Sequence, residues 1–389
     1  MVLPSIIYDQ SSKIKHEKGT LQTIHTPFSL CEDMLCRLNQ YCDLQKVDNI
    51  AVLFNLEFVD VLIRKYKIDC ERITFFPDSE LEKVLADSWY EVNLGQRIRF
   101  SRGEINMGKI ANKFHVVVMN PPYQAPKDSA EGGNSTLWDK FVSESFNLTA
   151  DDGYVCAVHP ANWRSQGEYS AIGDLLRSKQ MEYLEIHDVK DGEKLFGAST
   201  RYDWYVVKNA NNTRRTKVRG QDGKITDIRL QNLPVIPNGK FEEVIALFAQ
   251  DDNEKIDLRY ERSTYGTDKD WMSKKESKKH HLPCVCHVNI NNEISSMYYS
   301  EKDNGHFGTP KVIFARMAGG VFVDMEGKYG CCQDVSYIVD KPENLPKIAT
   351  ALRSKEFIDI CKMMSINLKD RYDRTAMKNL RKDFWKDFV

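Results

Sequence analysis

The sequence has no hydrophobic run that approaches the roughly 18 to 20 residues of a membrane helix, and its first residues, MVLPSIIYDQSSKIKHEKG, lack a secretory signal. Its ten cysteines include no C-x-x-C pair, which favours reduced thiols over a disulfide framework. It has almost no net charge, with 55 Lys and Arg residues against 56 Asp and Glu, so any nucleic-acid surface must be a local patch. These absences predict a cytoplasmic protein with no membrane segment.

A metal-binding pattern is also missing. Residues 280–287, HHLPCVCH, gather three histidines and two cysteines, but Cys284 and Cys286 are closer together than the paired ligands of a zinc knuckle. No matching second half follows them. We therefore expect no metal site.

The chain is longer than a usual single domain. With 389 residues, 41% of them hydrophobic, it has enough apolar material for two cores. The character of the sequence changes after about Asn209, where a polar and basic stretch, NANNTRRTKVRGQDGK, predicts a linker or an exposed hairpin. We expect one domain over residues 1–210 and a second over residues 211–389.

The most informative stretch is FHVVVMNPPYQ, Phe114–Gln124. An apolar run followed by Asn and two prolines predicts a buried strand that ends in a stiff turn, because each proline fixes one φ angle. The turn offers the amide of Asn120, the carbonyl of Pro121 and the aromatic face of Tyr123 at the carboxyl end of a strand. Open α/β sheets bind their ligands at such ends.

Two hydrogen-bond acceptors on one turn suit a particular reaction. The exocyclic amine of a nucleobase is a poor nucleophile, and acceptors that hold both of its protons would draw it toward a tetrahedral, reactive form. Asn120 and Pro121 supply two such acceptors. A base in a duplex reaches a buried turn only when it is flipped out, and Tyr123 could then stack on it.

Asn-Pro-Pro-Tyr after an apolar strand resembles the catalytic motif of the S-adenosylmethionine-dependent adenine-N6 DNA methyltransferases, especially those with a C-terminal, TaqI-like target-recognition domain. The resemblance implies catalytic roles for Asn120, Pro121, Pro122 and Tyr123, with Asn120 also touching the cofactor. It implies methyl transfer from S-adenosylmethionine to the N6 amine of adenine in double-stranded DNA after base flipping, in a restriction-modification or phage-protection setting. Methyltransferases that act on protein glutamine or on RNA guanine look similar at this turn, so those substrates remain open.

The implied fold is α/β, a Rossmann-like, seven-stranded, doubly wound sheet followed by a second, α+β target-recognition domain. Before the first strand, Thr26 and Pro27 open an amphipathic helix in which Leu30, Met34, Leu35 and Leu38 recur at helical spacing. The resemblance puts this Thr-Pro pair over the methionine end of the cofactor, although a simple helix start fits equally well.

The cofactor loop is expected after a buried strand at Asn49–Asn55. The family usually has a glycine-rich turn here, but this chain has Phe54, Asn55, Leu56 and Glu57 and no glycine. Asn55 tolerates a positive φ, and Glu57 could meet the ammonium group of the cofactor. The alternative is a DNA-binding subunit that kept the fold and lost cofactor binding.

Two further acids are assigned to the cofactor. Asp78 follows the second expected strand, ITFFPDSE, where an acid typically takes the ribose hydroxyls, although it could equally cap the next helix. Glu104 is the acid nearest to the segment expected at the adenine of the cofactor. The polar loop QAPKDSAEGGNSTLWDKF is expected to close over the flipped base before a helix at Thr136–Phe146.

Three later segments, DGYVCAVHPANWRS, MEYLEIHDV and TRYDWYVVKN, are expected to complete the sheet. His159 is interpreted as structural, because the amine becomes acidic only after methyl transfer and needs no strong base. Tyr202 and Trp204 should share one side of their strand, and the resemblance puts Tyr202 on the opposite face of the flipped base from Tyr123.

The C-terminal half is expected to read the DNA sequence. Arg214, Arg215, Lys274 and Lys275 belong to basic clusters that could contact phosphates, although each cluster alone could be a solvated face. Residues 305–340 predict three short strands with glycine turns, which resemble the specificity domain of the same methyltransferases. The tail is expected to be helical. We expect a monomer, with a partner subunit left open.

Overall fold

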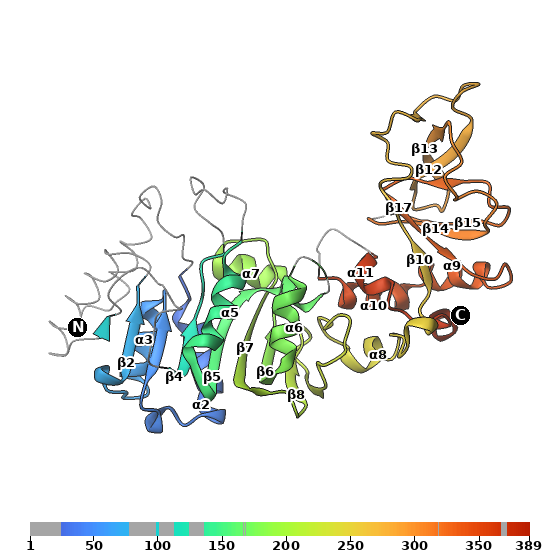
Figure 1. Ribbon diagram of the computed structural model, residues 1–389. Coiled ribbons are helices and arrows are strands. Elements are labelled where there is room, and N and C mark those ends of the chain that lie inside the picture. Colours follow the sequence, from blue (N-terminus) through green and yellow to red (C-terminus); the bar gives the residue numbers. More distant parts are fainter. Residues whose placement is uncertain are drawn as a thin grey trace. The chain divides into compact units, whose positions relative to one another are not determined.

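The computed structural model describes residues 25–77, 99–100, 113–123, 136–165, 167, 169–317, 319–366 and 372–389 (Figure 1). The chain divides into two compact units. Unit 1 comprises residues 1–163 and 169–231, and unit 2 comprises residues 164–168 and 232–389.

Unit 1 is built from alternating strands and helices. Its strands are β1 Ile50–Leu53, β2 Ile73–Phe76, β3 Arg99–Phe100, β4 Phe114–Met119, β5 Thr149–Pro160, β6 Lys179–Ile186, β7 Tyr202–Asn211, β8 Thr216–Arg219 and β9 Ile225–Ile228. Its helices are α2 Phe28–Tyr41, α3 Leu56–Arg64, α5 Trp138–Leu148, α6 Ser170–Ser178 and α7 Val189–Phe196.

These strands form one mixed sheet in the order β3-β2-β1-β4-β5-β7-β6-β8-β9. Strands β1, β2, β3, β4 and β5 are parallel neighbours, β7 runs antiparallel between β5 and β6, and β8 is parallel to β6. The carboxyl ends of β1, β2, β4, β5, β6 and β8 therefore share one edge, called here the carboxyl edge, and the opposite one is the amino edge. The expected α/β class is confirmed as a mixed α/β fold with a large mixed sheet.

The described sheet has nine strands, whereas seven were expected. The polar stretch after Asn209, expected to be a linker or an exposed hairpin, forms a hairpin of β8 and β9. This hairpin extends the sheet, because Tyr183, Leu184 and Glu185 of β6 pair with Lys217, Val218 and Arg219 of β8. Both strands belong to unit 1, although they lie beyond residue 210.

The core of unit 1 lies on both faces of the sheet. Helices α2 and α3 bury Leu30, Met34, Leu35, Leu38 and Phe58 in a cluster with alternate residues of the strands, as their helical spacing predicts. Tyr202 and Trp204 belong to this same cluster, which confirms that they share one side of β7. Helices α5 and α6 cover the other face (Figure 1).

Unit 2 contains two four-stranded sheets, ordered β10-β17-β14-β15 and β11-β13-β12-β16. Its strands are β10 Asp257–Arg259, β11 Met272–Ser273, β12 Leu282–Val288, β13 Ile294–Ser300, β14 Lys311–Ala315, β15 Val321–Asp324, β16 Gly330–Cys331 and β17 Val335–Val339. Its helices are α8 Phe241–Ile245, α9 Leu345–Arg353, α10 Lys355–Met364 and α11 Arg374–Met377. The expected helical tail is confirmed, and the segment expected to give three strands gives four.

The cysteines differ in part from expectation. A disulfide joins Cys286 of β12 to Cys332, with their Cα atoms 4.8 Å apart, because the parallel pairing of β12 with β16 brings the two residues together. In the described residues, no group of three or more His, Cys, Asp or Glu side chains is arranged to hold a metal ion. None of the described helices is long and apolar enough to cross a membrane.

Candidate active site

The turn after β4 lies at the carboxyl edge, as the sequence predicts. Asn120 has no exposed surface, and Pro121 and Pro122 are buried. The carbonyl of Tyr123 accepts a hydrogen bond from the backbone N–H of Leu137 at 3.2 Å, which ties the turn to the start of α5. Burial raises the pKa of the Tyr123 hydroxyl, which has no hydrogen-bond partner among the described residues.

Two long-range hydrogen bonds orient Asn120. Its side-chain Nδ2 donates to Oγ1 of the buried Thr26 at 3.0 Å, and its backbone N–H donates to Oδ1 of Asn55 at 3.2 Å. With Nδ2 directed at Thr26, the amide oxygen lies on the other side of the side chain. Thr26, Asn55 and Asn120 thus form one buried cluster at the ends of α2, β1 and β4.

The glycine-free turn after β1 has the backbone of a glycine turn. Phe54 adopts a φ of 73°, in the left-handed region that bulky residues rarely occupy. Its ring is buried and packs edge-on against Phe141 of α5, with centroids 4.8 Å apart. Asn55, which could tolerate a positive φ, has instead an extended backbone at φ −127°, and its side chain bonds to Asn120.

Glu57 stands in the first turn of α3 and is 3% exposed. Its Oε1 contacts Nδ1 of His25 at 2.9 Å, while its buried Oε2 has no hydrogen-bond partner among the described residues. A buried carboxylate oxygen without a partner is costly, and a cationic group would compensate it. This orphaned oxygen, close in sequence to Asn55, therefore fits the ammonium group expected there.

Asp78 and Glu104, assigned to the ribose and the adenine of the cofactor, lie outside the described residues, as does the loop over residues 124–135 that was expected to close over the base. Their roles stay predictions.

His159 is buried in the aromatic layer on the α5 face. It stacks on Trp138 with centroids 4.4 Å apart, and its Nε2 lies 2.9 Å from the hydroxyl of Tyr205. Burial lowers its pKa to about 4, so the ring is neutral near pH 7. These contacts support the structural interpretation of His159.

Tyr202 is held by a network that the sequence did not predict. Its hydroxyl donates to Oδ2 of Asp191 at 3.1 Å, and its ring stacks on His187 with centroids 4.3 Å apart. The edge of Phe196 meets the same ring. Tyr202 has no exposed surface, because His187 and Phe196 cover its ring, and its expected stacking on a flipped base stays a prediction.

His187 links two carboxylates beside Tyr202. Its Nδ1 bonds to Asp191 and its Nε2 lies 3.4 Å from Glu185. Burial lowers the pKa of His187, but the hydrogen bonds and charges of Glu185 and Asp191 outweigh this and leave it raised. A signal was present in the sequence, because His187 directly follows the carboxyl end of a strand and Asp191 follows it by one helical turn.

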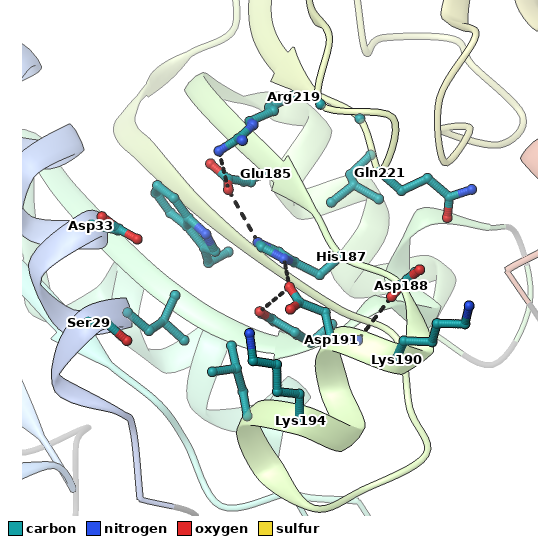
Figure 2. A pocket seen from close by; sticks show the side chains of 17 residues that line it. Ser29, Asp33, Glu185, His187, Asp188, Lys190, Asp191, Lys194, Arg219 and Gln221 are labelled. Atoms are coloured by element: carbon teal, nitrogen blue, oxygen red, sulfur yellow. Dashed lines mark hydrogen bonds and ion pairs between the residues drawn. The ribbon is translucent and has the colours of Figure 1, made fainter.

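The network lines a cavity of about 530 Å³ (Figure 2). One wall is α2, with Ser29 and Asp33, and the other is α7, with Lys190 and Lys194. Burial raises the pKa of Asp33, with Glu185 and Glu32 adding to the shift. Arg219 closes the cavity through an ion pair with Glu185 at 3.0 Å.

The four basic residues expected at the DNA backbone lie in different places. Arg214 and Arg215 precede β8 at the amino edge, away from Asn120, and Arg214 is paired with Glu182. Arg215 donates to the carbonyl of Asp227. Lys274 and Lys275 are exposed in unit 2, after β11.

One family model matches the chain, that of the Eco57I restriction-modification methylases, over residues 34–196. The match runs from α2 to the end of α7 and includes the turn after β4, but covers less than half of the 389 residues. A comparison with curated proteins gave no match.

Solved structures are similar at low identity. The type IIG restriction endonuclease BpuSI superposes with a TM-score of 0.50 at 13% identity, over 98% of this chain and 62% of BpuSI. The type IIL restriction-modification enzyme MmeI in complex with DNA superposes with a TM-score of 0.49 at 8% identity, over 90% of this chain and 64% of MmeI. The structure of a proposed class I S-adenosylmethionine-dependent methyltransferase from Listeria monocytogenes superposes with a TM-score of 0.43 at 15% identity. The superposition covers 55% of this chain and 70% of that protein.

The chain spans less than two thirds of BpuSI and of MmeI. At these identities the likeness to BpuSI is one of fold alone. The family match and this fold together support an S-adenosylmethionine-dependent methyltransferase of the restriction-modification type, with S-adenosylmethionine as its cofactor.

Proposed function

We propose that this protein transfers a methyl group from S-adenosylmethionine to the N6 amine of adenine in double-stranded DNA, after the base is flipped out of the duplex. The observation that carries the proposal is the position of Asn120. Its amide nitrogen is fixed by Thr26 and its backbone N–H by Asn55, in a proline turn at the carboxyl edge.

Asn120 and Pro121 would act on the substrate amine. The Asn120 amide oxygen and the Pro121 carbonyl accept the two protons of the amine, which localises its lone pair on nitrogen. Because Thr26 and Asn55 hold Asn120 before the substrate arrives, little reorganisation of this side chain is needed during the reaction. Pro122 stiffens the turn, and Tyr123 stacks on the extruded base.

S-adenosylmethionine would supply an electrophilic methyl group on its sulfonium. Glu57 fits the ammonium of its methionine end through the orphaned Oε2. Thr26 and Pro27 lie beside Asn120 at the start of α2, where they would cover the same end, and Phe54 and Asn55 shape the turn. Asp78 and Glu104 are proposed for the ribose and the adenine.

Unit 2 is proposed as the target-recognition domain, with the basic Lys274 and Lys275 at the phosphates. Neither lysine has an ion pair with any described residue, which leaves their charges available. We propose a restriction-modification or phage-protection setting in the cytoplasm, with the protein acting as a monomer.

The substrate can be tested directly. Purified protein is incubated with tritiated S-adenosylmethionine and, separately, with duplex DNA, structured RNA and a denatured protein mixture. We expect label in DNA, recovered as N6-methyladenine after digestion to nucleosides. Label in RNA or protein, or in another base, would contradict the proposal.

A second candidate is favoured by the glycine-free turn after β1. Phe54 is a bulky residue in a turn where the backbone must lie close to the cofactor, which would suit a DNA-binding subunit that no longer binds it. Calorimetry with S-adenosylmethionine separates the two candidates. A methyltransferase should bind at micromolar concentrations, whereas this subunit should show no heat of binding.

A further inference from the structure

Helix α7 presents two lysines to the cavity beside Tyr202. Lys190 and Lys194 are exposed and stand one turn apart on the same helix, which puts them on one face (Figure 2). Within the described part of the chain, neither has an ion pair. Two positive charges therefore stand at this wall without a direct ion pair, beside the carboxylates of Asp188 and Asp191.

The acids around α7 are already engaged. Asp191 bonds to His187 and to the Tyr202 hydroxyl, and Asp188 caps the helix by accepting from the Asp191 N–H at 3.0 Å. Glu193 accepts from the Ser199 hydroxyl at 2.5 Å. Glu185 is shared by Arg219, Tyr183 and His187. An anion from outside would therefore find the two lysines available.

Helix α7 is also held rigidly. It begins at the Asp188 cap and ends at Gly197, whose φ of 65° is the left-handed conformation usual after a helix. At Gly192 a Cβ atom would lie 2.1 Å from the carbonyl oxygen of Thr200, so the helix packs closely against the loop that follows it. The lysines thus project from a fixed support.

The position of α7 is the decisive observation. It joins the carboxyl end of β6 to the start of β7, so it lies at the carboxyl edge with the turn at Asn120. Arg214 and Arg215 lie at the amino edge, separated from it by the length of β6, eight residues or roughly 26 Å. A duplex that inserts a base at Asn120 must lie along the carboxyl edge, where α7 can reach its backbone and Arg214 cannot.

We propose that Lys190 and Lys194 bind phosphates of the DNA backbone next to the extruded adenine. The inference rests on the proposed function, because it takes DNA as the substrate. Asp33, on the opposite wall, is one of four acids that line the cavity, with Glu185, Asp188 and Asp191, and it would repel the same phosphates. The proposed phosphate contacts are therefore at the two exposed lysines of the α7 wall, on the side opposite Asp33.

The test measures DNA affinity against salt concentration for the full chain. Each phosphate that the protein no longer neutralises should lower the slope of log Kd against log salt by about 0.9, so Lys190→Gln with Lys194→Gln should lower it by about 1.8. At about 0.1 M salt, affinity should fall on the order of 10-fold to 100-fold, equally for all DNA sequences. The matched control is Lys67→Gln, because Lys67 is an exposed lysine that follows α3 toward the amino edge. This substitution should leave the salt slope and the DNA affinity unchanged.

A charge of opposite sign gives a second control. Asp33→Asn should tighten binding by about twofold, because a like charge is removed from the cavity. If the double lysine variant binds with an unchanged slope while the unaltered chain binds and methylates DNA, the lysine assignment is wrong. If the unaltered chain neither binds nor methylates DNA, the proposed function fails and the assignment with it.

Discussion

The turns after β1 and β4 end neighbouring parallel strands at the same edge, yet they are built by opposite means. The β4 turn is stiff because two prolines restrict its backbone locally. The β1 turn holds Phe54 in a left-handed conformation that its own sequence disfavours by about 1–2 kcal/mol. Asn55 joins the two turns through its hydrogen bond to Asn120.

The difference shows which interactions maintain the backbone conformation of each turn. Pro121 and Pro122 would favour their backbone in an isolated peptide. Phe54 keeps its φ through tertiary contacts, because its ring is buried against Phe141 and its N–H donates to the carbonyl of Phe76 at 2.9 Å. The strained turn therefore depends on the folded core, and the proline turn depends on it much less. The substitutions of Phe54 and Asn120 test the two sides of this contrast, and those of Asn55 and His187 test the contacts around them.

The largest effect is expected from Phe54→Ala. Removing a buried aromatic ring should lower the free energy of unfolding by about 3–5 kcal/mol. Phe54→Gly removes the same ring but relieves the positive φ, so it should be more stable than the alanine variant by about 1 kcal/mol. Urea unfolding of both variants measures the difference. Equal stabilities would mean that the turn is not strained.

Asn120→Ala tests the proline turn without disturbing its backbone restriction. The rate of methyl transfer to DNA should fall on the order of 100-fold to 1,000-fold, as for the loss of one group that stabilises a transition state. DNA affinity should stay within a few fold, because the phosphate contacts remain. Single-turnover methylation and anisotropy measurements check both, and a fully active variant would exclude Asn120 from the chemistry.

Asn55→Ala breaks the link between the turns. It leaves the buried N–H of Asn120 without its acceptor, which should cost about 1–3 kcal/mol of stability and slow methyl transfer. Asn55→Asp retains an oxygen acceptor and is the control. Thermal unfolding together with the methylation rate reports both effects, and an alanine variant with unchanged values would show that the two turns act independently.

The smallest effect concerns His187, which follows β6 and belongs to neither turn. Its pKa in the folded chain is raised above the ordinary 6.5, so its contribution to stability is complete below pH 6.5 and is lost as the pH rises through the folded value. The stability difference between the unaltered chain and His187→Gln should therefore shrink as the pH increases from about 6 upward. Urea unfolding at several pH values measures it. A difference that grows with pH would contradict the ion pairs with Glu185 and Asp191.

The sequence by itself determined the features that depend on neighbours along the chain. The helical spacing of Leu30, Met34, Leu35 and Leu38 fixed the buried face of α2, and the prolines after β4 fixed the end of that strand. Because successive side chains of a strand point to opposite faces, Tyr202 and Trp204 lie on one side of β7. These patterns act over a few residues, so they can be read without knowing the fold.

Only the tertiary structure decided the contacts between distant segments. Nothing near Asn55 in the sequence indicates that its side chain bonds to Asn120, 65 residues away, or that Phe54 takes the positive φ in its place. The hairpin after Asn209 was one of the two outcomes expected from the sequence, but its pairing with β6, which adds it to the sheet, was not. Such outcomes depend on which backbone groups and side chains the fold brings together. Local propensity depends on neighbours along the chain, so it does not identify these distant partners.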